Sequence, residues 1–433
     1  MCLLAVLFML SICALPLQRF VLIEYGASFN SAYILILCFD VLAAVLLFRQ
    51  LKRRPLSSFA SNTIIFLFLF NLSCLITLLI TGESIGEYTK SMAQFNTFVF
   101  PLLMLQYLNI SLQSLNRVMF FLTLFILITV TYEIFCYIFN LTVPIVLGEH
   151  IIGMSLSKFS TSYRLCGTFY EPSILARICS ILFAYYLYSE RKTTTTYTLI
   201  FLLLLILLGT TSLSGLLCLL LAFLLWAYDK KLISFNSSFL IFFVALSVVF
   251  SYSYVPDYFL QYFKRIFKLV DIANDLISLN FAENYRQRSE HFRIFSNFLF
   301  LLMQPQDMVF GISFSGVDNF AINSLLGSNK VCSILSWIII SSGVVGLSVF
   351  LWFISRIYRS CKGLYRRILT IHLLMLMSSG SLLKPIFWII IYYCLVASWA
   401  EDIQKDGTSR KLSCLRTYKN QGVRIKNAES NLV

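Results

Sequence analysis

The sequence is poor in charge, and this shortage sets the class of protein. Only 12% of its 433 residues are charged, whereas 59% are hydrophobic, and the mean hydropathy is +0.82. A water-soluble chain of this length has too few charged side chains to cover so much apolar surface. The composition therefore predicts an all-α polytopic integral membrane protein.

Several motifs are absent as well. The twelve cysteines include no CxxC pair, most of them lie in apolar stretches, and Cys166 is the clear exception. A disulfide framework and a zinc site both need paired ligands, so we predict neither, and we expect no metal or cofactor. The first apolar stretch has no basic segment before it and no small-residue cleavage site, which predicts a retained helix. The chain also lacks a convincing internal repeat, which disfavours a transporter built from related halves.

Long apolar stretches, in contrast, are abundant. A helix needs about 20 mostly apolar residues to cross roughly 30 Å of hydrocarbon. Stretches of suitable length predict about twelve transmembrane helices, at Met1–Leu17, Ser31–Phe48, Ala60–Ile80, Phe95–Leu112, Val118–Phe139, Pro172–Tyr188, Tyr197–Thr210, Thr211–Tyr228, Phe239–Tyr254, Val331–Ile354, Ile368–Leu383 and Ile386–Trp399.

The seventh and eighth of these form one charge-free run of 32 residues. One upright helix of that length would measure about 48 Å, which is too long for the bilayer. Small and polar residues occupy the middle of the run, from Gly209 to Gly215. We therefore predict two short helices joined by a turn.

The distribution of lysine and arginine predicts the orientation. With the N-terminus inside, the cytoplasmic segments hold 21 of these residues and the short outer loops hold 5. Because such residues near short loops are retained in the cytoplasm, both termini are predicted to be cytoplasmic. The net charge of +14 is then mostly an orientation signal that also anchors the protein to anionic lipid, so we expect no nucleic-acid partner.

This orientation divides the chain into six parts, two of which are extracytoplasmic segments. The parts are transmembrane helices 1 to 5 in residues 1–139, a first periplasmic loop in 140–171, helices 6 to 9 in 172–254, a large periplasmic loop in 255–330, helices 10 to 12 in 331–400 and a cytoplasmic tail in 401–433.

Four ionisable residues lie within the predicted spans, namely Asp40, Glu133, Arg177 and His372. Such residues are costly in hydrocarbon, so each should face the bundle interior or a wet cavity. Each is a candidate site residue. The alternative is that they form ion pairs that serve packing alone, such as Arg177 with Asp40 or Glu133. The spacing in the sequence does not show which residue is the partner.

The large outer segment contains a cluster of three arginines and one histidine, Arg286, Arg288, His291 and Arg293. One interpretation is a helical surface on which Glu290 forms ion pairs with Arg286 and Arg293. The functional interpretation is that the planar guanidinium groups bind a diphosphate bidentately. With Arg164 from the first outer segment, the two loops would close on one anionic substrate.

Glu171 also has two interpretations. It directly precedes Pro172 at the predicted start of a span, so it can complement a helix N-terminus and pair with Arg164. A glutamate at a partly desolvated rim can instead have a raised pKa and accept a proton from a sugar hydroxyl. Sequence alone leaves both interpretations open.

The segment from Arg164 through Gly167 to Glu171, Pro172 and Ser173 resembles a motif of bacterial O-antigen polymerases of the Wzy type. That family belongs to a larger set of membrane polysaccharide polymerases and ligases. Further similarities are in Arg288–Phe295, Gly311, Asn323 and Ser342–Gly346, which resemble the second outer loop and the span after it, and in the serine-rich turn Thr211–Gly215.

The resemblance implies a GT-C-like fold and a glycosyltransferase of the bacterial inner (plasma) membrane. Such an enzyme moves a growing glycan from undecaprenyl diphosphate to the next lipid-linked repeat unit and so builds O-antigen or capsule. Arginines would stabilise the leaving diphosphate, and Glu171 or His291 would act as the base. The implied partners are the lipid-linked donor and acceptor, membrane lipids, a chain-length regulator and a flippase.

Three other functions remain as alternatives. An O-antigen ligase typically has a histidine beside the asparagine of its second loop, whereas Ile322 precedes Asn323 here, which favours the polymerase. A lipid-linked oligosaccharide flippase is expected to lack a large outer domain. An unrelated membrane acyltransferase would need a histidine in or near a span, and only His372 qualifies.

Overall fold

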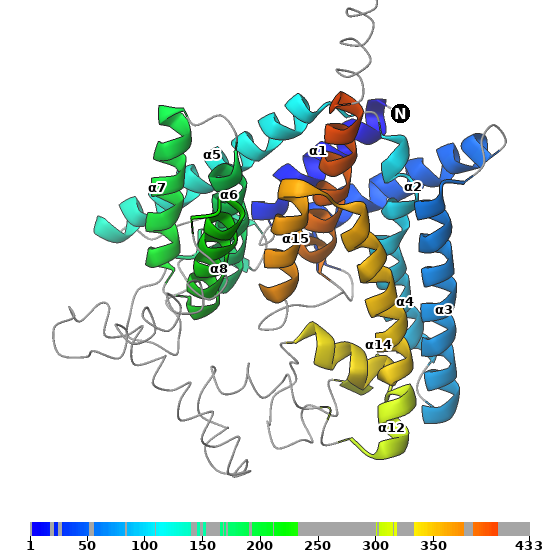
Figure 1. Ribbon diagram of the computed structural model, residues 1–433. Helices are drawn as coiled ribbons and strands as arrows, with labels where there is room; N and C mark the ends of the chain where they lie inside the picture. The colour runs from blue at the N-terminus through cyan, green and yellow to red at the C-terminus, as the bar shows by residue number, and fades with distance from the viewer. Residues whose placement is uncertain are drawn as a thin grey trace, which may run out of the picture.

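The computed structural model is helical in the residues that it describes, apart from two short β-hairpins (Figure 1). These residues are 2–17, 21–24, 28–51, 56–82, 85–108, 110–139, 145–147, 150–152, 165–167, 169, 172–189, 193–210, 212–232, 300, 303–314, 316–317, 333–375 and 384–405. The predicted ninth span and most of the large outer segment lie outside them.

Among the described residues, four helices are long and apolar enough to cross a membrane: α3 (Ser58–Thr81), α5 (Leu112–Ile138), α14 (Ile334–Ser360) and the helix Pro385–Lys405. Shorter apolar helices are α1 (Cys2–Cys13), α2 (Ser31–Leu51), α6 (Pro172–Tyr188), α7 (Thr194–Gly209) and α8 (Leu213–Asp229). The other labelled helices are α4 (Ile85–Val99), α12 (Pro305–Phe310) and α15 (Gly363–Met375). This set fits a helical membrane protein, and the count of twelve spans stays a prediction.

The two hairpins are short connections between helices. Strand β1 (Val21–Glu24) pairs antiparallel with β2 (Ser28–Asn30), and β3 (Ile145–Leu147) pairs antiparallel with β4 (His150–Ile152). The all-α prediction missed these strands because each is only three or four residues long.

The predicted break in the charge-free run is confirmed. Helix α7 ends at Gly209, and α8 starts at Leu213 after Ser212. The Ser212 side chain accepts a hydrogen bond from the Gly215 backbone N–H, as a typical N-cap does. Two short helices therefore replace one that would be too long.

The predicted fourth span is wrong in its bounds. Helix α4 begins at Ile85 and ends at Val99, where two 3₁₀ turns follow, η2 (Phe100–Leu103) and η3 (Leu105–Tyr107). Pro101 explains the change, because its ring removes a backbone donor and disfavours continuation of the α-helix.

Helix α14 is broken at Gly343, which has φ 64° and ψ −170°. Figure 1 shows its first part lying across the view next to α12, while the second part runs beside α3. The sequence predicted one continuous span there, because small and apolar residues at a helix break keep the hydropathy of the segment high.

Helix α6 lies at the centre of one half of the bundle. Nearly all its residues are buried, and it packs against α7, α8 and α15. In the other half, aromatic rings fill the space between α3 and α14, where Phe66 stacks on Phe353 with ring centroids 4.0 Å apart.

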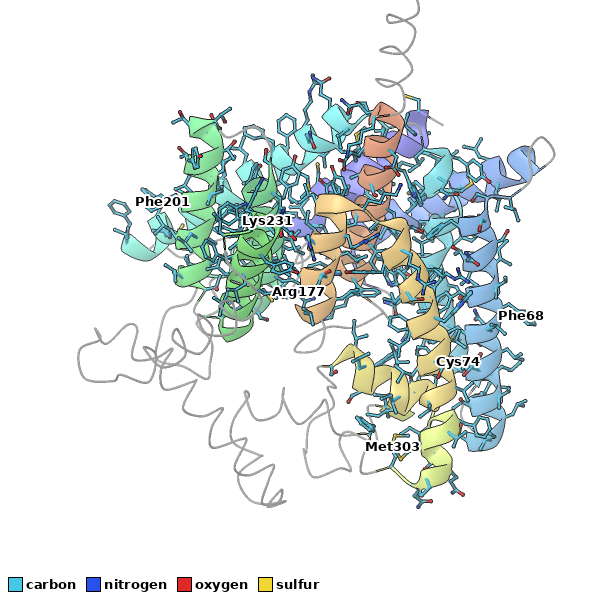
Figure 2. All side chains as sticks on the ribbon, viewed as in Figure 1. Phe68, Cys74, Arg177, Phe201, Lys231 and Met303 are labelled. Carbon is cyan, nitrogen blue, oxygen red and sulfur yellow. The ribbon has the colours of Figure 1, made fainter. Side chains whose placement is uncertain are left out.

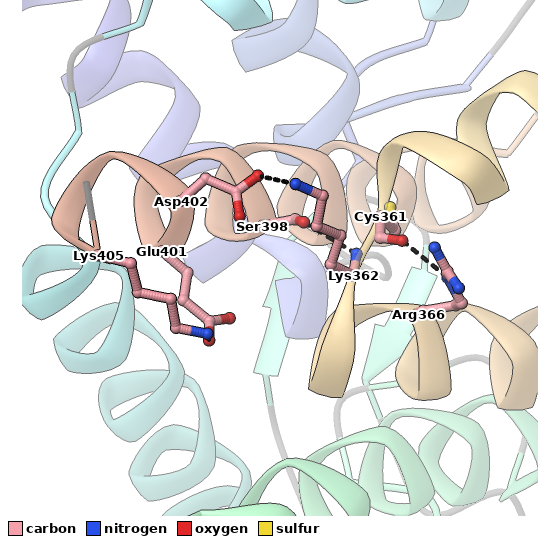
Figure 3. A network of polar contacts seen from close by, with 7 residues as sticks. All are labelled: Cys361, Lys362, Arg366, Ser398, Glu401, Asp402 and Lys405. Carbon is pink, nitrogen blue, oxygen red and sulfur yellow. Dashed lines mark hydrogen bonds and ion pairs between the residues drawn. The ribbon is translucent and has the colours of Figure 1, made fainter. Parts of the chain in front are cut away.

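Several helix ends meet in one polar cluster. The Tyr188 hydroxyl at the end of α6 donates to Asp229 at the end of α8 (2.8 Å), and Asp229 also pairs with Arg367 near the start of α15 (2.5 Å). Lys362, between α14 and α15, pairs with Asp402 at 2.7 Å, and its backbone N–H donates to the Ser398 hydroxyl (Figure 3). We call this end of the bundle the basic end, because Lys230, Lys231, Arg356, Arg359 and Arg366 lie at the same helix ends.

Candidate functional site

The six predicted site residues all lie outside the described residues: Arg164, Glu171, Arg286, Arg288, His291 and Arg293. Two parts of the motif pattern are described. We define the first motif region as Leu165–Phe169 with the start of α6. We define the second motif region as the segment from α12 to Ser313 with the break in α14.

The first motif region is held from two sides. The Leu165 backbone N–H donates to the Gly209 carbonyl at the end of α7 (3.1 Å). The carboxylate of Glu133 on α5 accepts hydrogen bonds from the backbone N–H groups of Cys166 (3.0 Å to Oε2) and Gly167 (2.6 Å to Oε2). Glu133 is only 5% exposed. The loop is therefore fixed between α5 and the break that separates α7 from α8.

The same loop forms a tight turn. The Cys166 thiol donates to the Phe169 carbonyl (2.7 Å), and the Phe169 N–H donates to the Cys166 carbonyl (3.2 Å). Gly167 has φ 57°, a left-handed conformation that favours glycine. This conformation explains why the motif needs a glycine at this position.

Two helix N-termini adjoin the loop. Helix α6 starts at Pro172, where the missing proline N–H costs no helical hydrogen bond. Helix α8 starts nearby, since the loop residue Leu165 donates its backbone N–H to the carbonyl of Gly209, four residues before the first residue of α8. The partial positive charge at such N-termini favours an anion in front of them.

The second motif region joins α12 to the break in α14. Its N–H groups at Ile312 and Ser313 donate to the carbonyls of Ile340 (2.7 Å) and Ser341 (3.1 Å). These carbonyls lie just before the break. The Thr77 hydroxyl of α3 also donates to the Phe310 carbonyl. Sequence analysis missed Thr77, since a threonine at the end of a span is no signal of a partner.

Glycine is required on both sides of this junction. A Cβ on Gly343 would lie 2.1 Å from the Val309 carbonyl oxygen, and a Cβ on Gly311 would lie 2.5 Å from the Ser342 nitrogen. Both residues also have positive φ. Gly311 and the Gly343 segment were singled out by the resemblance, and the structure brings them into contact.

Both motif regions lie at the end of the bundle opposite the basic end. Helices α6, α8 and α14 all finish at the basic end, so their first residues lie at the other end. Figure 1 shows α12 and the first part of α14 at the opposite side of the view from the start of α15.

The ionisable residues inside the helices have different surroundings. Arg177 is buried in α6 and influences both Cys218 of α8 and His372 of α15 electrostatically (Figure 2). The His372 Nε2–H donates to the Phe387 carbonyl (3.1 Å), a tautomer assigned from the carbonyl acceptor. Asp40 has Tyr33 and Tyr392 as its electrostatic neighbours. The pairings of Arg177 with Asp40 or Glu133 stay predictions.

An apolar cavity of about 20 Å³ lies between α1, α5, α6 and the helix Pro385–Lys405. Ile12, Met119, Ile178 and Ile390 are among its lining residues. With room for roughly one water and apolar walls, it is a packing gap. Within the described part of the chain, no three histidine, cysteine, aspartate or glutamate residues gather as a metal site would require.

No protein-family model matches the chain, and no curated protein gives a significant match. Any assignment therefore depends on the motif residues and on their geometry.

Proposed function

We propose that this protein is a membrane glycosyltransferase that polymerises undecaprenyl-diphosphate-linked repeat units into a surface polysaccharide such as O-antigen or capsule. A single observation carries the proposal. Both motif regions fold against helix breaks at the same end of the bundle, and that end is opposite the basic end.

The basic end supports the predicted orientation in a bacterial inner membrane. Lysine and arginine gather there, which is the pattern of a cytoplasmic face. The motif regions would then face the periplasm, where lipid-linked repeat units are joined. Both termini would be cytoplasmic, with about twelve spans in a GT-C-like arrangement.

The first motif region supports an anionic substrate. Its loop follows Arg164 in the chain, leads into α6 and is bonded to Gly209 at the break before α8. Guanidinium groups and helix N-termini both stabilise phosphate oxygens. Arg164 with Arg286, Arg288 and Arg293 would hold the diphosphate of the donor.

The proposed reaction is glycosyl transfer. The acceptor hydroxyl oxygen forms a bond to the anomeric carbon of the donor glycan, and the bond from that carbon to the diphosphate oxygen breaks. Arginines stabilise the charge that develops on the leaving diphosphate. Glu171 or His291 takes the proton of the hydroxyl.

A gene deletion followed by gel separation of surface glycan tests the proposal. Loss of the polymerase should leave lipid A capped with a single repeat unit. Accumulation of long lipid-linked chains would instead indicate a ligase, and loss of all surface glycan would indicate a flippase. Either of these results would overturn the proposal.

Complementation of the deletion strain tests the site. The Arg164→Ala variant should fail to restore the ladder of chain lengths. Lys405→Ala is the matched control, because it also removes a basic side chain, and the pair of Lys405 with Glu401 lies exposed in the last helical turn. A normal ladder from the Arg164 variant would remove Arg164 from the site.

A further inference from the structure

Glu133 is an acidic residue inside an apolar helix, yet it is only 5% exposed. Burial of a carboxylate is costly unless hydrogen bonds replace its hydration. Backbone N–H groups of the first motif region provide such bonds. The carboxylate of a membrane helix therefore accepts hydrogen bonds from a loop outside its own helix.

The geometry of these bonds is specific. Two consecutive backbone N–H groups, at Cys166 and Gly167, point toward the same carboxylate and form a small anion-binding nest. The positive φ of Gly167 permits this arrangement. Charge-assisted hydrogen bonds of this kind are stronger than those between neutral groups.

Together with the bond from Leu165 to Gly209, these contacts fix three successive residues of the loop. Arg164 immediately precedes the fixed residues in sequence, and α6 begins shortly after them. A carboxylate that fixes the path of this loop therefore also restricts the positions of the residues that directly precede and follow it in the chain.

We infer that Glu133 is a positioning residue for the proposed diphosphate site, and that its carboxylate holds the first motif region without contacting the substrate. This inference rests on the proposed function. Misplacement of a substrate-binding group by about 1 Å can lower a rate by about 100-fold. Loss of the nest should therefore reduce catalysis even though Glu133 takes no part in the chemistry.

The test uses purified full-length protein in liposomes with a lipid-linked repeat unit. Glu133→Gln keeps the shape and one acceptor oxygen but removes the negative charge, and its amide NH₂ group takes the place of the oxygen that lies 3.2 Å from the Cys166 nitrogen. Glu133→Asp keeps the charge. Thr123→Val is the matched control, because Thr123 is a buried polar residue on the same helix whose hydroxyl meets Tyr186. Rates are measured per folded molecule, with kcat and KM determined separately.

A second readout is independent of activity. Cys166 is fully buried and belongs to the loop that Glu133 holds, so a membrane-impermeant maleimide should label its thiol slowly in the natural protein. Glu133→Gln should expose it and raise the labelling rate at least about tenfold, while kcat/KM falls by about 10- to 100-fold. Glu133→Asp should be intermediate in both measurements, and Thr123→Val should change neither. Peptide mapping by mass spectrometry isolates Cys166 from the other cysteines.

Unchanged labelling and unchanged kcat/KM in Glu133→Gln would overturn the inference while leaving the proposed function intact. If Glu133→Gln does not accumulate, Glu133→Asp decides by the same two readouts. A natural protein that does not elongate the glycan, combined with exposure of Cys166 in Glu133→Gln, would refute the proposed function and keep Glu133 as the residue that holds the loop.

Discussion

Gly343 is the position where addition of a single methyl group should reduce the stability of the fold the most. Gly343→Ala places a Cβ 2.1 Å from the Val309 carbonyl oxygen and 2.5 Å from the Phe310 nitrogen. Both contacts are with backbone atoms, so no side chain can rotate away. The segment after α12 has to separate from the break in α14, or the break has to change its backbone angles.

The cost has two sources. A non-glycine residue held at φ 64° and ψ −170° carries strain of about 1–3 kcal/mol. Separation of the two segments also breaks the hydrogen bonds from Ile312 to Ile340 and from Ser313 to Ser341, which contribute about 1 kcal/mol each. The expected loss is about 3–5 kcal/mol, a large share of the roughly 5–15 kcal/mol that stabilises a typical domain.

Gly82→Ala provides the matched control. Gly82 also has positive φ (65°), but an added Cβ would have no atom within 4 Å. Its replacement should cost only the left-handed backbone penalty, about 1–2 kcal/mol. Thermal unfolding in detergent, followed by size-exclusion chromatography, measures both variants. Equal shifts of the unfolding midpoint would refute the close approach of α12 and α14 as the reason for Gly343.

Three other changes have different expected sizes. Ser212→Ala removes the N-cap acceptor of α8 and should cost about 1 kcal/mol, so an unfolding midpoint equal to that of the natural protein would contradict the cap. Asp229→Asn breaks the partly exposed pair with Arg367 and should cost less than about 1 kcal/mol, with a smaller effect in high salt; a loss that is large and independent of salt would contradict this. Arg164→Lys should lose the ladder of chain lengths almost as fully as Arg164→Ala, because the bidentate fork is lost, and a normal ladder from the lysine variant would show that charge alone suffices.

Hydropathy predicted the helix bounds where the length of the apolar stretch agrees with the proline, glycine or serine residues that start or end a helix. Helix α6 has the predicted bounds because Pro172 can start a helix but cannot continue one. The break between α7 and α8 was predictable because length alone ruled out one helix and Gly209 and Ser212 marked the turn.

The misplaced and broken helices have a common physical cause. Hydropathy measures how apolar a segment is, whereas the path of a helix depends on backbone geometry. Pro101 ends the α-helical region of α4 within an apolar stretch, and Gly343 breaks α14 within another. In the second case the reason lies far away in sequence, since the backbone of Val309 and Phe310 occupies the space that a side chain would need.

The candidate site divides in the same way. The resemblance singled out Gly311 and the Gly343 segment without predicting that they meet, and the structure shows their close contact. The arginines of the large outer segment stay a prediction, because they lie outside the described residues.

Glu133 shows why the partner of a buried charge was beyond the sequence. Side-chain reasoning considers oppositely charged residues, and it offered Arg177 as a partner. The donors that bind Glu133 include two backbone N–H groups, which every residue except proline possesses and which therefore leave no mark in a sequence. What selects Cys166 and Gly167 is the left-handed turn at Gly167, which aligns two successive donors. A motif glycine next to a membrane helix is thus a candidate for an anion-binding turn. An otherwise unexplained acidic residue in a neighbouring span is then a candidate for the carboxylate that this turn binds.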